Sequence, residues 1–236
     1  MAVKTRTLVV VSVALGLAAL VGTGHGPGVF LRDAHAAPAV AAAPPPGQQR
    51  PDFISWYEAQ PQVSVPIDRG SAKVLVVKFN DYQCPPCRQT HLEYKQLLEK
   101  YTATGRVKYV LKHFPLEREC NAGVKGDLHS AACEAAAAVV MAQSKGTADK
   151  LEEWFFANQP SLTPATVKQA ASEVAGIRDF DAQYARALTL VKTDAGLGAL
   201  LGAKSTPTFF INGRLIAGGL PPALFEAAIE HELRRP

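Results

Sequence analysis

The sequence VLVVKFNDYQCPPC, residues 74–87, joins an apolar run to two cysteines that flank two prolines. The apolar run at 74–79 predicts a buried strand, and the periodicity of residues 88–101 predicts a helix that starts at the prolines. Cys84 then lies at a helix N-terminus, where unpaired N–H groups and the helix dipole favour a thiolate. Cys87 follows one turn later, within reach of a mixed disulfide on Cys84. The spacing indicates disulfide exchange, with Cys84 as the exposed thiol of low pKa and Cys87 as the buried one.

Two cysteines at this spacing can also belong to a zinc site or form an inert disulfide. Zinc needs about four nitrogen or sulfur ligands, and the sequence has neither a second CxxC motif nor a closely spaced histidine pair. Cys120 and Cys133 could complete a set of four, but their separation is not that of a zinc ribbon. We therefore expect redox chemistry, with no metal and no bound cofactor.

A second informative stretch is STPTFFING, residues 205–213. Residues 208–211 and 214–217 predict two strands, and the Asn-Gly pair between them predicts a tight hairpin turn. Pro207 stands at the start of the first strand, where a missing N–H group is tolerated. A bond that precedes proline is also the only kind for which the cis form is common.

The two motifs together resemble those of the thioredoxin superfamily, in particular the DsbA-like thiol-disulfide oxidoreductases. The resemblance runs from about Val63 to the C-terminus. It implies that Cys84 is the attacking cysteine and that Cys87 is the resolving one. It also implies that Thr206 and Pro207 form a cis-proline loop that binds an extended substrate peptide.

The implied fold is α/β, a thioredoxin fold with a helical insertion at about 120–202. The insertion separates a β-α-β half from the cis-proline β-β-α half, and plain thioredoxin has no helical block of this size. We expect strands at 73–79 and 107–111, a short edge strand at 63–66, helices at 131–143, 147–158, 164–175 and 179–201 (the last one broken near 196–198), and a final helix at 222–233.

Four residues near the cysteines are candidates for tuning them. Lys78 stands where many family members carry an acid; a buried ammonium would favour a nearby thiolate, although its head could instead reach water. Asp81 is more typical of a turn residue than of a proton shuttle. Pro85 and Pro86 replace a dipeptide that contains histidine in DsbA. Thiolate stabilisation then depends on the helix terminus and Lys78, which predicts a weaker oxidant than DsbA.

Cys120 and Cys133 flank a short loop at the start of the expected insertion. Two further cysteines in an oxidising compartment usually pair, so we expect a structural disulfide. A relay of electrons to Cys84 and Cys87 is an alternative, and free or metal-bound thiols are another.

The first 36 residues predict either a cleaved export signal or a membrane anchor. Lys4 and Arg6 precede an apolar run at 8–21, and Ala34-His35-Ala36 fits a cleavage site. The uncharged stretch continues to Leu31, so a span of about 20 residues is the alternative.

Residues 37–51, rich in alanine and proline, predict a linker that leads into a domain at 52–236. The net charge of +4 is carried mostly by the first 51 residues. The domain itself is nearly neutral, so nothing indicates binding to nucleic acid.

These features predict an exported thiol-disulfide oxidoreductase, periplasmic or otherwise extracytoplasmic, with the inner-membrane tether left open. We expect it to oxidise cysteine pairs of reduced secreted polypeptides and to be reoxidised by a membrane partner linked to quinones. The alternatives are a disulfide reductase or isomerase and, in another class, a non-catalytic module that binds polypeptides. The sequence does not decide between them.

Overall fold

The computed structural model describes residues 50–236. The predicted signal or anchor and most of the predicted linker lie outside the described residues. The last two residues assigned to the linker, 50 and 51, instead begin helix α1 (Arg50–Glu58). Sequence analysis missed this helix because nine residues give little periodicity. Its place is fixed by Phe53 and Tyr57, one turn apart, which are both buried in the core.

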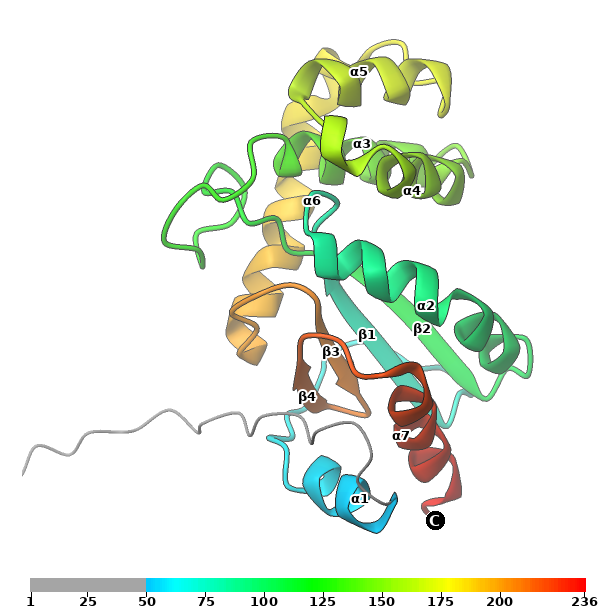
Figure 1. Cartoon of the computed structure of the whole chain (residues 1–236). Coiled ribbons are helices and arrows are strands. Elements are labelled where there is room, and N and C mark those ends of the chain that lie inside the picture. Colours follow the sequence, from blue (N-terminus) through cyan, green and yellow to red (C-terminus); the bar gives the residue numbers. More distant parts are fainter. Residues whose placement is uncertain (1–49) are drawn as a thin grey trace, which may run out of the picture. The chain divides into compact units, whose positions relative to one another are not determined.

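A four-stranded sheet forms the centre of the domain (Figure 1). Its strands are β1 (Val74–Asn80), β2 (Val107–His113), β3 (Thr208–Ile211) and β4 (Arg214–Ala217), in the spatial order β2-β1-β3-β4. β1 pairs in parallel with β2, and β3 is antiparallel to both β1 and β4. All seven residues of β1 are buried, as its continuous apolar run predicts for a central strand.

Helices cover both faces of this sheet. α2 (Pro85–Thr102) and α7 (Pro222–Arg234) join α1 on the face to which Val74 and Val76 point. α6 (Phe180–Leu201) packs on the other face, against Val77 and Phe79. The alternation of β1 side chains between two apolar layers explains why this strand has no polar face.

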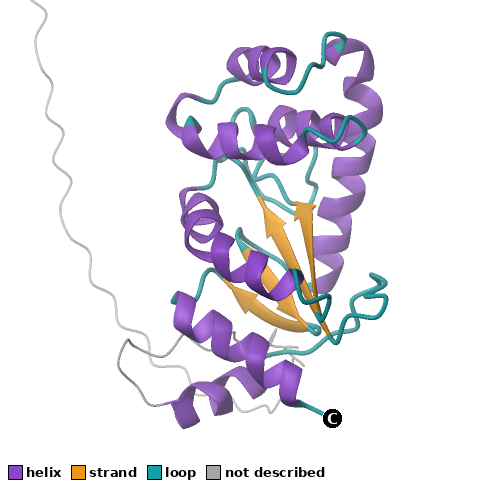
Figure 2. Cartoon of the chain, turned by 90° about the vertical axis from the view of Figure 1, so that its right-hand side faces the viewer, coloured by secondary structure: helices purple, strands orange, loops and turns teal. Residues whose placement is uncertain are grey.

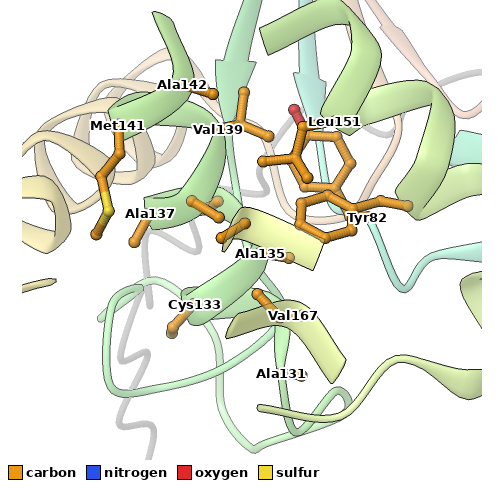
Figure 3. Packing of buried hydrophobic residues seen from close by; sticks show 14 of the residues in the cluster. Tyr82, Ala131, Cys133, Ala135, Ala137, Val139, Met141, Ala142, Leu151 and Val167 are labelled. Atoms are coloured by element: carbon orange, nitrogen blue, oxygen red, sulfur yellow. The ribbon is translucent and has the colours of Figure 1, made fainter. Parts of the chain in front are cut away.

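The insertion contains α3 (Ala132–Gln143), α4 (Ala148–Ala157), the short helix η1 (Gln159–Ser161), α5 (Pro164–Glu173) and α6. α3 is rich in alanine and almost wholly buried, so the neighbouring helices approach it closely. Figure 3 shows Ala135, Val139 and Leu151 packed with Tyr82, which lies in the loop after β1. The insertion therefore has its own apolar core that reaches the segment before the cysteines.

The chain order β-α-β, helical insertion and β-β-α confirms the predicted fold class. Figure 2 shows the strands of the sheet with helices packed around them. Two details were wrong. The first is the expected break in α6, which is continuous through Gly196 and Gly198. Gly198 does not end the helix; its missing side chain lets the helix pack closely on the rings of Phe79 and Phe114.

The second wrong detail is the expected edge strand at 63–66. Only Gln62 forms a bridge, to Arg214, and Val63 donates one hydrogen bond to the Gly213 carbonyl. The proline at position 66 has no N–H group with which to extend this ladder. Across residues 50–236, no helix has the length and apolar composition of a membrane span.

Candidate active site

The two cysteines lie where β1 passes into α2. Asp81 turns the chain: its Oδ1 accepts a hydrogen bond from the Gln83 N–H at 2.7 Å, and its carbonyl accepts one from the Cys84 N–H. Cys84 is the N-cap of α2 and Pro85 is the first helical residue, where the missing N–H group costs no hydrogen bond. Both prolines are exposed. The local sequence thus fixes Cys84 at the positive end of an 18-residue helix.

Cys84 is nearly buried, with 4% of its surface exposed. The expectation of an exposed thiol was therefore wrong, because the Thr206–Pro207 loop covers it. The Cys84 Sγ lies 3.2 Å from the Thr206 carbonyl oxygen. The bond between Thr206 and Pro207, predicted to be cis, is cis in the structure.

The pKa of Cys84 is lowered to about 6. The largest cause is a hydrogen bond from the Cys87 thiol, which outweighs the opposing effect of burial. The Thr206 side chain also favours the thiolate; its hydroxyl is buried and makes no hydrogen bond within residues 50–236. The charge of Asp81 acts in the opposite direction.

Cys87 is fully buried, and both thiols are free. Burial raises the pKa of Cys87 well above its usual value, and its hydrogen bond to Cys84 raises it further. The positive charge of Lys78 lowers the pKa of Cys87 in part. The pair therefore combines one thiol that ionises readily with one that keeps its proton.

Lys78 lies next to Cys87, and only 2% of its surface is exposed. The alternative in which its head reaches water is therefore wrong. Its Nζ donates to the Cys87 carbonyl at 3.1 Å and lies over the rings of Phe156 and Phe209, 5.6 and 5.9 Å from their centroids. Burial lowers the pKa of Lys78, and the charges of Cys87 and Glu152 oppose this.

Asp81 does more than turn the chain. Its buried Oδ2 accepts a hydrogen bond from the Leu116 N–H at 2.7 Å and lies 2.8 Å from Nδ1 of His129. Asp81 is thus a turn residue, as expected, and also the partner of a histidine. Sequence analysis missed His129, which is 45 residues beyond Cys84 in a loop without any motif.

The insertion holds the active-site turn at further points that the sequence did not indicate. The Gln159 side chain donates to the carbonyls of Tyr82 and Cys84, at 2.7 and 3.1 Å. Arg88 of α2 donates to the Phe156 carbonyl at 2.7 Å. Glu152 of α4 lines a cavity of about 730 Å³ together with Lys78, and burial raises its pKa to about 7.

Cys120 and Cys133 form a disulfide, as predicted, and both are buried. The Glu117 carboxylate accepts a hydrogen bond from the Cys133 N–H at 2.9 Å. The loop that this disulfide closes carries His129, which pairs with Asp81 of the active-site turn. The loop closed by the Cys120–Cys133 disulfide therefore contacts the turn that carries Cys84.

Comparisons with known proteins agree on the family. A family model described as thioredoxin matches residues 67–231. Among curated relatives, a Na(+)/H(+) antiporter NhaA 1 of Salinispora arenicola is 28% identical over 201 residues, and an NhaA 3 of Salinispora tropica is 30% identical over 186 residues. These alignments cover 80% and 74% of this chain but 29% and 27% of the relatives. The chain thus spans less than a third of their length.

Solved structures share the fold at low sequence identity. A periplasmic thioredoxin-like protein of Salmonella enterica serovar Typhimurium has a TM-score of 0.55 and 23% identity, over 75% of this chain and 91% of that one. BdbD of Bacillus subtilis has a TM-score of 0.55 and 21% identity, over 75% and 95%. The α-DsbA1 protein of Wolbachia pipientis has a TM-score of 0.55 and 20% identity, over 68% and 85%.

The sheet order, the helical insertion and the paired cysteines at the start of α2 define a DsbA-like variant of the thioredoxin fold. The chain belongs to the thioredoxin family.

Proposed function

We propose that this protein is an extracytoplasmic thiol-disulfide oxidoreductase that oxidises cysteine pairs in exported polypeptides. The observation that carries the proposal is the contrast between Cys84, with a pKa of about 6, and Cys87, whose pKa is raised. A stabilised thiolate favours the reduced form of the pair, and the disulfide form gains nothing equivalent. Such a pair accepts electrons from substrate thiols.

The reaction begins with the Cys84–Cys87 pair as a disulfide. A substrate thiolate attacks the Cys84 sulfur, a mixed disulfide forms, and Cys87 leaves as a thiolate that takes up a proton. A second substrate thiolate then attacks the substrate sulfur of this mixed disulfide and releases Cys84 as a thiolate. Two electrons pass from the substrate to the cysteine pair, and the low pKa makes Cys84 a good leaving group.

The residues around the two cysteines have distinct roles in this reaction. The loop at Thr206 and Pro207 presents backbone groups to an extended substrate peptide beside Cys84. The buried Lys78 favours the Cys87 thiolate when that group leaves. In the reverse direction, this thiolate would resolve a mixed disulfide on Cys84.

The cell compartment and the partners follow from the same proposal. The Cys120–Cys133 disulfide supports an oxidising, extracytoplasmic location, and one structural neighbour is described as periplasmic. After each cycle the dithiol needs an electron acceptor, for which we propose a membrane partner linked to quinones. The N-terminal segment would supply either the export signal or a tether to the inner membrane.

The decisive experiment is a redox titration of the pair against glutathione, with mass spectrometry of trapped Cys84 and Cys87. We expect a potential between roughly −270 mV, the value for thioredoxin, and roughly −120 mV, the value for DsbA. The Cys84 pKa of about 6 supports this range, because the corresponding cysteines have pKa values of about 7 and about 3.5. A potential at or below that of thioredoxin would favour a reductase.

Activity assays separate the remaining alternatives. The wild-type disulfide form should oxidise a reduced, unfolded protein that has several disulfides, and Cys84→Ser should abolish this activity. Faster repair of a scrambled protein than oxidation of a reduced one would favour an isomerase. Full function in Cys84→Ser would instead identify a non-catalytic polypeptide-binding module.

A further inference from the structure

We propose that His129 is a positioning residue of the cysteine site: the loop closed by the Cys120–Cys133 disulfide holds its imidazole against Asp81, where its positive charge favours the Cys84 thiolate. The inference rests on the proposed function only for its catalytic consequence. The thiolate itself can be measured without turnover.

The loop is fixed on both sides of His129. Leu128 donates its N–H to the Leu116 carbonyl at 2.9 Å, and Ala131 donates its N–H to Oε1 of Gln83 at 2.7 Å. Nδ1 of His129 lies 2.8 Å from Oδ2 of Asp81, and its side chain is only 14% exposed. Two of these contacts, to Asp81 and Gln83, hold the imidazole and its loop against the active-site turn.

The charge balance at this turn explains what the imidazole does. The Asp81 carboxylate, close to Cys84, raises the pKa of that thiol. An imidazolium that donates to the same carboxylate offsets its charge and adds a positive charge near the sulfur. The coupling is reciprocal, because an interaction that favours the His129 cation in the presence of the Cys84 thiolate also favours the thiolate in the presence of the cation.

The groups that face His129 come from three segments. Asp81 follows β1, Cys84 caps α2, and Glu117 follows β2. Burial lowers the pKa of His129, and the charges of all three groups raise it. The net pKa of His129 is raised above its usual value of 6.5. Cys84 itself faces Asp81 and Cys87, and its charge also acts on Lys78.

These values give the pH range of the effect. Cys84 ionises near pH 6, where His129 still carries its proton. The thiolate and the imidazolium therefore coexist from about pH 6 up to the raised pKa of His129. Above that pKa the histidine is neutral and its effect on the thiolate is lost.

The test is a titration of the Cys84 thiolate in reduced His129→Gln, followed by the rate of alkylation against pH. Glutamine keeps a hydrogen-bond donor for Asp81 but has no charge. We expect the pKa of Cys84 to rise by about half to one unit, so that alkylation below the wild-type pKa slows about three- to tenfold. His129→Arg keeps the positive charge and should restore most of the rate.

His91→Gln is the matched control. The His91 side chain is 17% exposed and pairs with Glu153 at 3.2 Å, a carboxylate other than Asp81. Its titration curve for Cys84 should match that of the wild type. An equal shift in His129→Gln and His129→Arg would mean that the histidine acts only through its shape, and the proposal would be wrong.

A measurement on the wild-type protein removes any dependence on the folding of the variants. NMR titration of the His129 ring should give a higher pKa in the reduced protein than in the protein with a Cys84–Cys87 disulfide, because oxidation removes the thiolate. Equal values in the two redox states would overturn the proposal. Neither result depends on whether the protein is an oxidase, a reductase or a binding module.

Discussion

Gly198 of α6 offers a quantitative test of how the insertion packs on the sheet. A Cβ atom at this position would lie 2.7 Å from Cδ2 of Phe114 and 2.8 Å from Cδ1 of Phe79. Both rings are fully buried, and they meet edge to face with centroids 6.2 Å apart. Phe79 also packs edge to face on Phe210. A methyl group at Gly198 would therefore lie too close to two buried rings that already pack on each other, so Gly198→Ala overpacks the core.

The magnitude follows from two opposing effects. Alanine stabilises a helix interior relative to glycine by about 0.5–1 kcal/mol. Overpacking of a well-filled core costs about 1–3 kcal/mol. Gly196 lies in the same helix two residues earlier and is exposed, and a methyl group added there would have no neighbour within 4 Å. The gain in helix propensity therefore applies to both positions, and the overpacking applies to Gly198 alone.

We expect Gly196→Ala to raise the free energy of unfolding by about 0.5–1 kcal/mol and Gly198→Ala to lie about 1–3 kcal/mol below it. At roughly 2–4 °C per kcal/mol for a domain of this size, their melting temperatures should differ by about 2–12 °C. Urea denaturation and thermal melting of the oxidised protein provide the measurement. Equal stabilities would show that the helix or the rings adjust without cost, and would refute the packing argument.

Three further variants test the surroundings of the cysteines. Lys78→Met should raise the pKa of Cys87, measured by alkylation, because it removes the positive charge that lowers that pKa; an unchanged Cys87 titration would contradict this role of Lys78. The joint change Cys120→Ser and Cys133→Ser should lower the free energy of unfolding by about 3 kcal/mol without abolishing exchange; unchanged stability with lost recycling would indicate a relay. Because the Glu152 pKa is raised from 4.5 to about 7, wild-type stability should fall as pH rises between these values, by about 3 kcal/mol at most. In Glu152→Gln this fall should shrink, and an unchanged pH profile would contradict the assignment.

The parts of the fold that the sequence predicts are those with strong local signals. The seven buried residues of β1 form a continuous apolar run, and the prolines after Cys84 mark the first turn of α2. The predicted start at residue 164 agrees with α5, where the Thr163 side chain caps the helix and Pro164 is its first residue. In these segments the backbone conformation is decided by neighbours along the chain.

The parts that the sequence could not predict depend on contacts between distant segments. His129 meets Asp81 across 48 positions, and Gln159 meets Tyr82 across 77. A loop residue carries no periodicity that could indicate its partner, and a single sequence offers no second signal. The burial of Lys78 was likewise undecided, because it depends on aromatic rings brought in by α4 and β3.

Through these distant contacts, the insertion supplies groups that change the pKa values of the two cysteines. The charge of Glu152 of α4 opposes the lowering of the Lys78 pKa by burial, and the positive charge of Lys78 in turn lowers the pKa of Cys87. Asp81 is paired with His129, which comes from the disulfide loop. Lys78 and Asp81, the charged residues of the thioredoxin half that act on the thiols, therefore both have a counter-charge in the inserted segment. The insertion therefore acts on both thiols through these two charges, and the motif residues alone do not set the reactivity of the two cysteines.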